Sequence, residues 1–225
     1  MNVYCISGID TDCGKSVVTG LIARFLLEKG ENVITQKAIQ TGCVGISEDI
    51  LTHRKLMKKE LYGVDKSGFT CPFVFPLPAS PHLAAAEVAR EFDEVSLDQA
   101  TMELSLRFDK VILEGAGGVY VPLKRDLPFI DYIKDRDYPL IIVTSSKLGS
   151  INHTLLTLEA AANRGIKIAG LVYNHHFDKE PKITADSKTI FSEYLVKLGY
   201  PDVIVDLESF DEENPVLPDF SPLFK

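Results

Sequence analysis

Gly8–Ser16 (GIDTDCGKS) contains residue types that suit a phosphate group. Backbone N–H groups that point inward, together with a helix N-terminus, can cradle phosphate oxygens. The Lys15 side chain can neutralise the β- and γ-phosphates, and the Ser16 hydroxyl can ligate Mg²⁺. The segment therefore predicts a loop that binds a nucleoside triphosphate, with contacts from Asp12, Cys13, Gly14, Lys15, Ser16 and Val17.

This loop departs from the general phosphate-loop pattern in its length. Five residues separate Gly8 from Gly14, where the general motif has four, and Ile9 occupies the place of the motif's first glycine. An ordinary strand–turn–helix that contains Gly-Lys-Ser by chance is the alternative interpretation. The apolar run before the loop and the helical periodicity after it favour the phosphate site.

A second segment, Glu114–Gly118 (EGAGG), follows the clearest buried strand of the sequence, Asp109–Leu113. A carboxylate at a strand end is well placed to bind Mg²⁺ beside the first loop, and the glycines let a ligand approach the backbone. Taken alone, the segment is equally well explained as a glycine-rich turn. Beside the phosphate loop it predicts a metal ligand at Glu114 and nucleotide contacts from Glu114, Gly115, Ala116 and Gly117.

Other polar residues lie where predicted elements begin or end. Lys37 closes a strand and can bind an anion, although a solvated lysine is the simpler interpretation. Asp49 is either a metal ligand or a charge favoured by the dipole at a helix start. Asn174 either reads a base edge or is a common turn residue. The pair His175–His176 has no evident carboxylate partner and is expected on the surface.

The elements that position these residues follow from apolar periodicity. Short apolar runs predict strands at 2–7, 32–38, 109–113, 138–145, 166–173 and 203–207. Helices are predicted at 15–29, 48–61 (with its basic residues exposed), 83–90, 96–108, 151–164 and 184–198. Loops are expected at 42–47 and 68–81, the latter after a strand end. This alternation predicts one α/β domain over residues 1–225, a parallel-sheet P-loop NTPase fold with helices on both faces and its ligand at the carboxyl ends of the strands.

Composition narrows the class of protein. The 225 residues are 45% hydrophobic and 25% charged, and the net charge of -8 disfavours a nucleic-acid partner. The four cysteines form no C-x-x-C pair and are expected to be reduced thiols of a cytoplasmic protein. We read no signal peptide and no membrane-spanning run, and the tail from Asp211 is acidic and proline-rich.

Several motifs, in order, resemble those of dethiobiotin synthetases, the ATP-dependent enzymes of biotin synthesis. The five-residue gap in the first loop is usual in that family, and EGAGG and LGxINH are far more specific than a phosphate loop alone. The motifs are GIDTDCGKS at 8–16, QKAIQTG at 36–42, ASPHLAA at 79–85, VILEGAGGVYVPL at 111–123, KLGSINHTLLT at 147–157 and AGLVYN at 169–174.

The resemblance implies a reaction and roles for residues. CO₂ adds to one amine of 7,8-diaminopelargonic acid, ATP phosphorylates the carbamate with Mg²⁺ present, and the second amine closes the ring. Lys15 and Lys37 match catalytic positions, and Asn174 matches an adenine contact. The metal positions match Ser16, Asp49 and Glu114; the substrate positions match Lys37, Thr41, Gly117, Gly118 and Asn152, the last at the subunit boundary of a homodimer.

Two other classes of P-loop protein stay as alternatives. Partitioning-type ATPases are nucleotide-switched binding proteins with a second lysine inside the loop, whereas Ile9–Cys13 contains none. They often carry a basic amphipathic helix, and the C-terminal segment here is acidic. Cobyrinic-acid-type amidoligases usually add a glutaminase domain, for which 225 residues leave no room.

Overall fold

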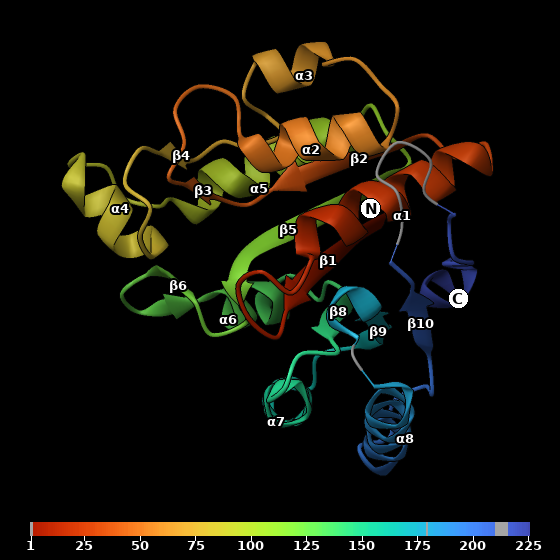
Figure 1. Ribbon diagram of the computed structural model, residues 1–225. Coiled ribbons are helices and arrows are strands. Elements are labelled where there is room, and N and C mark those ends of the chain that lie inside the picture. The colour runs from red at the N-terminus through yellow and green to blue at the C-terminus, as the bar shows by residue number, and fades with distance from the viewer. Residues whose placement is uncertain (1, 179, 210–215) are drawn as a thin grey trace.

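Six parallel strands form the central sheet of the computed structural model, which describes residues 2–178, 180–209 and 216–225 (Figure 1). The strand order is β10-β9-β8-β1-β5-β2. The predicted strands are all present, as β1 (Asn2–Gly8), β2 (Val33–Lys37), β5 (Lys110–Gly118), β8 (Leu140–Ser145), β9 (Ile168–Asn174) and β10 (Ile204–Leu207). β5 continues through Gly118 instead of ending at Leu113. Because the strands are parallel, their carboxyl ends share one edge of the sheet.

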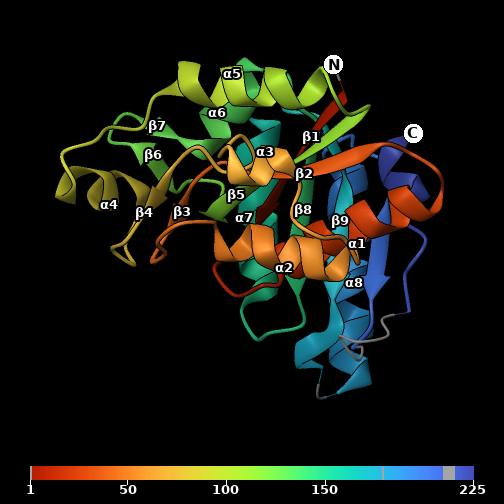
Figure 2. The same cartoon turned by 90° about the horizontal axis from the view of Figure 1, so that it is seen from above.

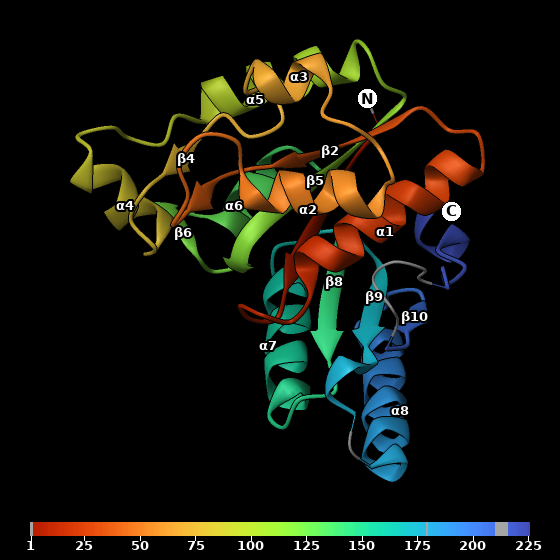
Figure 3. The same ribbon diagram turned by 45° about the horizontal axis from the view of Figure 1, so that its top comes forward.

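Helices cover both faces of the sheet, and a separate apolar core lies between the helices and the sheet on each face. Figure 2 shows α1 and α2 side by side, and Figure 3 shows α7 and α8 packed together on the other face. One face is covered by α1 (Lys15–Glu28), α2 (Glu48–Leu56) and the 3₁₀ turn η2 (Ser221–Phe224). The other is covered by α5 (Glu94–Ser105), α6 (Phe129–Asp135), α7 (Ser150–Ala162) and α8 (Pro181–Lys197). The predicted fold class is confirmed, and a single domain over 1–225 stays a prediction.

Short elements gather beyond the carboxyl end of β5 (Figure 1). There α4 (Pro81–Glu87) contacts β3 (Gln40–Thr41), β4 (Val74–Phe75) and β6 (Pro122–Lys124). β3 pairs with β4 in parallel, and β6 forms an antiparallel hairpin with β7 (Leu127–Pro128). The sequence predicted an ordered loop for part of this region and nothing for the hairpin or α6. These short elements surround the space beyond the carboxyl edge of the sheet.

The helix predicted over 48–61 is too long, and its basic residues are not all exposed. α2 ends at Leu56, and the chain turns at Lys58, whose φ is 53°. A four-residue helix, α3 (Gly63–Lys66), follows. Arg54 is buried because Asp65 on α3 accepts hydrogen bonds from its Nε and Nη2 at 2.9 and 2.7 Å. The buried ion pair explains why the expectation of an exposed basic face is wrong at Arg54.

The expectation for the histidine pair is wrong at His175. Its ring is buried in the 3₁₀ turn η1 (His175–Phe177), whereas His176 is exposed as predicted. Nδ1 lies 2.9 Å from Asp178, three residues along the chain, and Nε2 lies 2.9 Å from Asp206, which the fold brings in on β10. Burial would lower the pKa of His175, but these two carboxylates outweigh it and raise the pKa above its ordinary value of 6.5.

We expect the folded chain to lose stability as pH rises past the raised pKa of His175. A group whose pKa is higher in the folded state stabilises it fully below its unfolded pKa, here about 6.5, and less as pH rises through the folded pKa. Urea unfolding between pH 6 and 8.5 should therefore show a stability advantage over His175→Gln that shrinks with pH. His176→Gln is the control and should follow the parent chain. A difference between parent and His175→Gln that stays constant with pH would contradict this.

Three further predictions concern the cysteine thiols, membrane-spanning segments and the acidic tail. All four cysteines are free, as predicted, and all four are buried. Within the described ranges, no helix is both long and apolar enough to cross a bilayer. The acidic tail predicted from Asp211 begins in residues 211–215, which lie outside the described residues.

Candidate active site

The predicted phosphate loop connects β1 to α1 and folds closely on itself. Gly14 precedes the helix with a φ of 99°, and a Cβ there would lie 2.4 Å from Nδ2 of Asn174. A Cβ on Gly8 would lie 2.3 Å from Sγ of Cys13. Both positions therefore require glycine. Cys13 is buried in the core beneath the loop, which agrees with a packing role for its thiol.

The start of α1 is suited to an anion. Gly14 has no side chain to cap the N–H groups of the first turn, and those groups carry the positive end of the helix dipole. The ammonium group of Lys15 is buried and donates to the carbonyl oxygen of Asp10 at 2.8 Å. A phosphate bound in the loop would offer Lys15 a charged acceptor in place of this carbonyl. The hydrogen bond from Lys15 to the phosphate would be stronger than the one to the carbonyl.

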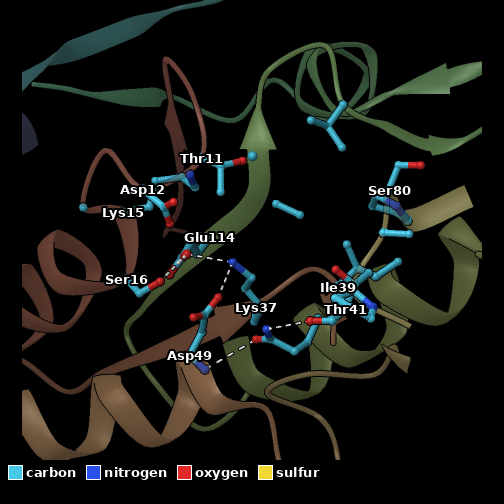
Figure 4. A pocket seen from close by; sticks show the side chains of 18 of the residues that line it. Thr11, Asp12, Lys15, Ser16, Lys37, Ile39, Thr41, Asp49, Ser80 and Glu114 are labelled. Carbon is cyan, nitrogen blue, oxygen red and sulfur yellow. Dashed lines mark hydrogen bonds and ion pairs between the residues drawn. The ribbon is translucent and has the colours of Figure 1, made fainter. Parts of the chain in front are cut away.

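A cluster of charged groups adjoins this loop (Figure 4). The Lys37 ammonium lies 2.7 Å from Oε1 of Glu114 and 2.5 Å from Oδ2 of Asp49. The Ser16 hydroxyl donates to the same Glu114 oxygen at 3.0 Å. Thus Lys37 and the three predicted metal ligands, which are far apart in the sequence, share one contact network.

The sheet itself brings the lysine and the glutamate together. Lys37 at the end of β2 pairs in register with Glu114 on β5. Burial alone would lower the pKa of Lys37, but Glu114 and Asp49 outweigh it, so the pKa lies above its ordinary value. Burial would raise the pKa of Glu114, yet Lys37 and His53 hold it far below its ordinary value. Both groups are therefore charged at neutral pH.

The donor set fits Mg²⁺. Among the described residues, no three His, Cys, Asp or Glu side chains converge as a metal cage. Mg²⁺ rarely uses such a cage: it takes one or two carboxylates and completes its shell with water and phosphate oxygens. Asp49, Glu114 and Ser16 provide two carboxylates and a hydroxyl, and the Lys37 ammonium already bridges the two carboxylates as a cation.

A cavity of about 670 Å³ joins the phosphate loop to the region around α4. Its size is typical of small-molecule sites. Figure 4 shows Lys15 and Ser16 toward one end, Lys37 in the middle, and Thr41, Ile39 and Ser80 toward the other end. Most of the predicted site residues line it, namely Asp12, Gly14, Lys15, Ser16, Val17, Lys37, Thr41, Asp49, Glu114, Ala116 and Gly117.

The remaining predicted contacts do not line this cavity, which is formed by residues that the structure describes. They are Cys13, Gly115, Gly118, Asn152 and Asn174. The carbonyl of Gly115 accepts from Lys37 at 2.9 Å. Asn174 is buried and donates from Nδ2 to the Cys13 carbonyl at 3.0 Å, which ties β9 to the phosphate loop. Asn152 lies on the exposed side of α7 and touches none of the cluster.

The sequence missed two residues that position the charged cluster, His53 and Gln40. It also missed several residues of the cavity lining, namely Thr11, Ile39, Pro78, Ala79, Ser80, Pro81 and Val121. His53 is fully buried, with Nε2 2.7 Å from Oε2 of Glu114. Gln40 accepts hydrogen bonds from the Ser47 hydroxyl at 2.7 Å and the Asp49 N–H at 3.4 Å, and so fixes the start of α2. A signal for His53 existed, because it lies four residues after Asp49 and therefore on the same helix face.

The family model that matches the chain is described as an AAA domain and covers residues 2–207. The ATP-dependent dethiobiotin synthetase BioD of Chlorobaculum tepidum is 49% identical over 208 residues, which cover 92% of this chain and 87% of that protein. The ATP-dependent dethiobiotin synthetase BioD 2 of Haemophilus influenzae is 51% identical over 172 residues, or 76% of this chain and 90% of that protein.

Solved structures share the fold. A MinC:MinD cell division protein complex from Aquifex aeolicus matches with a TM-score of 0.56 at 12% identity, over 94% of this chain and 83% of that one. Such a low identity indicates a common fold only. The sequence identities, by contrast, are four times as high and extend over most of both chains. The chain therefore belongs to the dethiobiotin synthetase family.

Proposed function

We propose that this protein is an ATP-dependent dethiobiotin synthetase that carboxylates 7,8-diaminopelargonic acid with CO₂ and closes the ureido ring, releasing ADP and phosphate. One observation carries the proposal. The Lys37 ammonium contacts Glu114 and Asp49 beside the phosphate loop and lines the cavity that extends from this loop to Thr41. A reaction that joins an organic anion to a γ-phosphate needs a cation at this junction.

In the first step, one amine of the substrate attacks CO₂ and forms a carbamate. The carbamate is an anion and would be repelled by the triphosphate. Lys37 is charged at neutral pH because its pKa is raised, so it acts as an electrostatic partner for the carbamate and not as a base. The Thr41 hydroxyl at the other end of the cavity is suited to contact the substrate.

In the second step, a carbamate oxygen attacks the γ-phosphorus and ADP leaves. The product is a carbamic–phosphoric anhydride. Positively charged groups fixed around the transferring phosphoryl group supply most of the rate in such reactions. Lys15 and the N-terminus of α1 are assigned to the β- and γ-phosphates, and Lys37 to the carbamate side. Mg²⁺, held by Ser16, Asp49 and Glu114, neutralises charge on the phosphates when bound.

In the third step, the second amine attacks the carbonyl carbon, the ring closes and phosphate leaves with the former carbamate oxygen. The backbone at Gly117 and Gly118 is assigned to the substrate side. Gly115 and Ala116 border the same turn and are assigned, with Asn174 and residues Asp12 to Val17, to the nucleotide. The position of Asn174, bonded to the carbonyl of Cys13, supports an adenine contact at the edge of the loop.

The working form is proposed to be a homodimer in the cytoplasm. Asn152 is assigned to the substrate although it lies on the exposed side of α7, away from the cavity of its own chain. A second copy placed against α7 would give Asn152 a site to contact. Four buried free thiols are typical of a reducing compartment.

ADP release in the presence of ATP, Mg²⁺ and bicarbonate tests this function. We expect release to depend on the diamine, because the acceptor of the phosphoryl group exists only as its carbamate. A substrate analogue with one amine is the control and should give no ring-closed product. Diamine-independent hydrolysis, with no dethiobiotin detected by mass spectrometry, would contradict the proposal.

A further inference from the structure

His53 is a buried residue of α2 that lies against Glu114 on the side away from the cavity. Its side chain is 0% exposed, and it is absent from the lining of the cavity. Gly20 of α1 allows α2 to approach this closely, since a Cβ there would lie 2.9 Å from Leu56 and 3.2 Å from the His53 Cα. Close packing of the two helices therefore places the imidazole against the sheet, within hydrogen-bond distance of Thr35 on β2 and Glu114 on β5.

The hydrogen bonds around His53 assign its protons. Glu114 is ionised and only accepts, so Nε2 of His53 donates to Oε2 across 2.7 Å. Nδ1 lies 3.1 Å from the Thr35 hydroxyl, whose oxygen already accepts from Nη1 of Arg54 at 2.7 Å. The Thr35 hydrogen is then available to donate to Nδ1. An imidazole that donates from Nε2 to Glu114 and accepts at Nδ1 from Thr35 satisfies all of these groups.

The two oxygens of Glu114 have different surroundings. Oε1 faces Ser16 and Lys37, whereas Oε2 faces only His53 among the bonds described. In the proposed function, Ser16 and Lys37 take new partners when Mg²⁺ and the carbamate bind. The His53 bond lies outside the cavity and is compatible with every one of those states.

We infer that His53 is a positioning residue that holds Glu114 from behind, so that Glu114 offers Oε1 alone to the metal ion. The inference rests on the proposed function, because it requires Glu114 to ligate Mg²⁺. Without the Nε2 donor, Oε2 would be a buried acceptor without a partner, and the carboxylate would turn toward other donors. Partners of this kind, behind a metal ligand, typically change metal affinity by roughly 10- to 100-fold.

Magnesium dependence of ATP binding tests the role of His53 without turnover. ATP affinity is measured by calorimetry across a Mg²⁺ series, with the thermal midpoint of each variant. We expect His53→Leu to raise the half-saturating Mg²⁺ concentration at least about tenfold. His53→Gln, whose amide nitrogen can replace Nε2 as donor, should stay within about threefold of the parent. Leu56→Ala, a packing control on the same helix, should lower the midpoint but leave the Mg²⁺ dependence unchanged.

Three results would overturn the inference. His53→Leu could keep the parent's Mg²⁺ dependence, His53→Leu and His53→Gln could shift it equally, or Leu56→Ala could shift it as much as His53→Leu. If His53→Leu does not fold, His53→Asn replaces it, because its shorter amide cannot reach Glu114. A parent chain whose ATP affinity does not respond to Mg²⁺ would overturn the metal site of the proposed function as well, and the parent measurement alone identifies that case.

Discussion

Replacement of Lys37 with glutamine is expected to lower turnover by roughly 10²- to 10³-fold, the usual effect of removing a fixed donor from a developing anion. ATP affinity should change by less than about threefold, because Lys15 and the start of α1 hold the phosphates in the proposed site. Glutamine can still donate to Glu114, which also keeps Ser16 and His53 as partners, so the chain should fold. Steady-state kinetics and calorimetric ATP binding measure the two effects separately.

The control for Lys37→Gln is the same substitution at an exposed surface lysine. Lys167 is exposed and pairs with Asp137 at the surface, so Lys167→Gln should keep both turnover and ATP affinity. Near-normal turnover in Lys37→Gln would show that the assignment of Lys37 is wrong. A loss of ATP affinity as large as the loss of turnover would place Lys37 on the nucleotide instead of the carbamate.

Replacement of Lys15 with methionine is expected to give the converse result, a loss of ATP affinity. The side chain is similar in length but carries no charge, so the charge-assisted bond to the phosphates is removed. Such bonds are worth up to about 3 kcal/mol, which corresponds to roughly a hundredfold change in affinity. Calorimetry with ATP and Mg²⁺ measures it directly.

Lys29 at the other end of α1 is the matched control for Lys15. Its ammonium lies 5.4 Å from the centre of the Phe25 ring, remote from the loop, and Lys29→Met should bind ATP as the parent does. Unchanged ATP affinity in Lys15→Met would contradict the assignment of the loop. Together the two pairs of variants separate nucleotide binding from the step that uses the carbamate.

The sheet and its order of elements could be predicted because their signals are local. Each of the six strands is a short apolar run, and the ends of β2 and β5 identified Lys37 and Glu114 as neighbours of a ligand. Because parallel strands end at one edge, Lys37 and Glu114 could both be placed at the ligand edge of the sheet, but the strand order that makes β2 and β5 neighbours was not predicted. In the structure, the register of β2 against β5 places Lys37 opposite Glu114.

The remaining features depend on contacts between distant segments. His53, Arg54 and His175 are types of residue that are seldom fully buried without a partner. Each is buried here beside a carboxylate that the fold supplies: Glu114, Asp65 and Asp206 respectively. Sequence spacing alone identifies none of these partners. The walls of the cavity around Gln40 and the turn at Pro78–Pro81 likewise form only when β3, β4 and α4 come together.

In the proposed reaction, one CO₂ and one ATP are consumed for each ring closed, and isotope labelling measures both. The protein is incubated with the diamine, ATP, Mg²⁺ and ¹³C-bicarbonate, and ADP and product are quantified together by mass spectrometry. We expect dethiobiotin that carries a single ¹³C and is formed in a one-to-one ratio with ADP. ADP released without ring-closed product, or product that lacks the label, would contradict it.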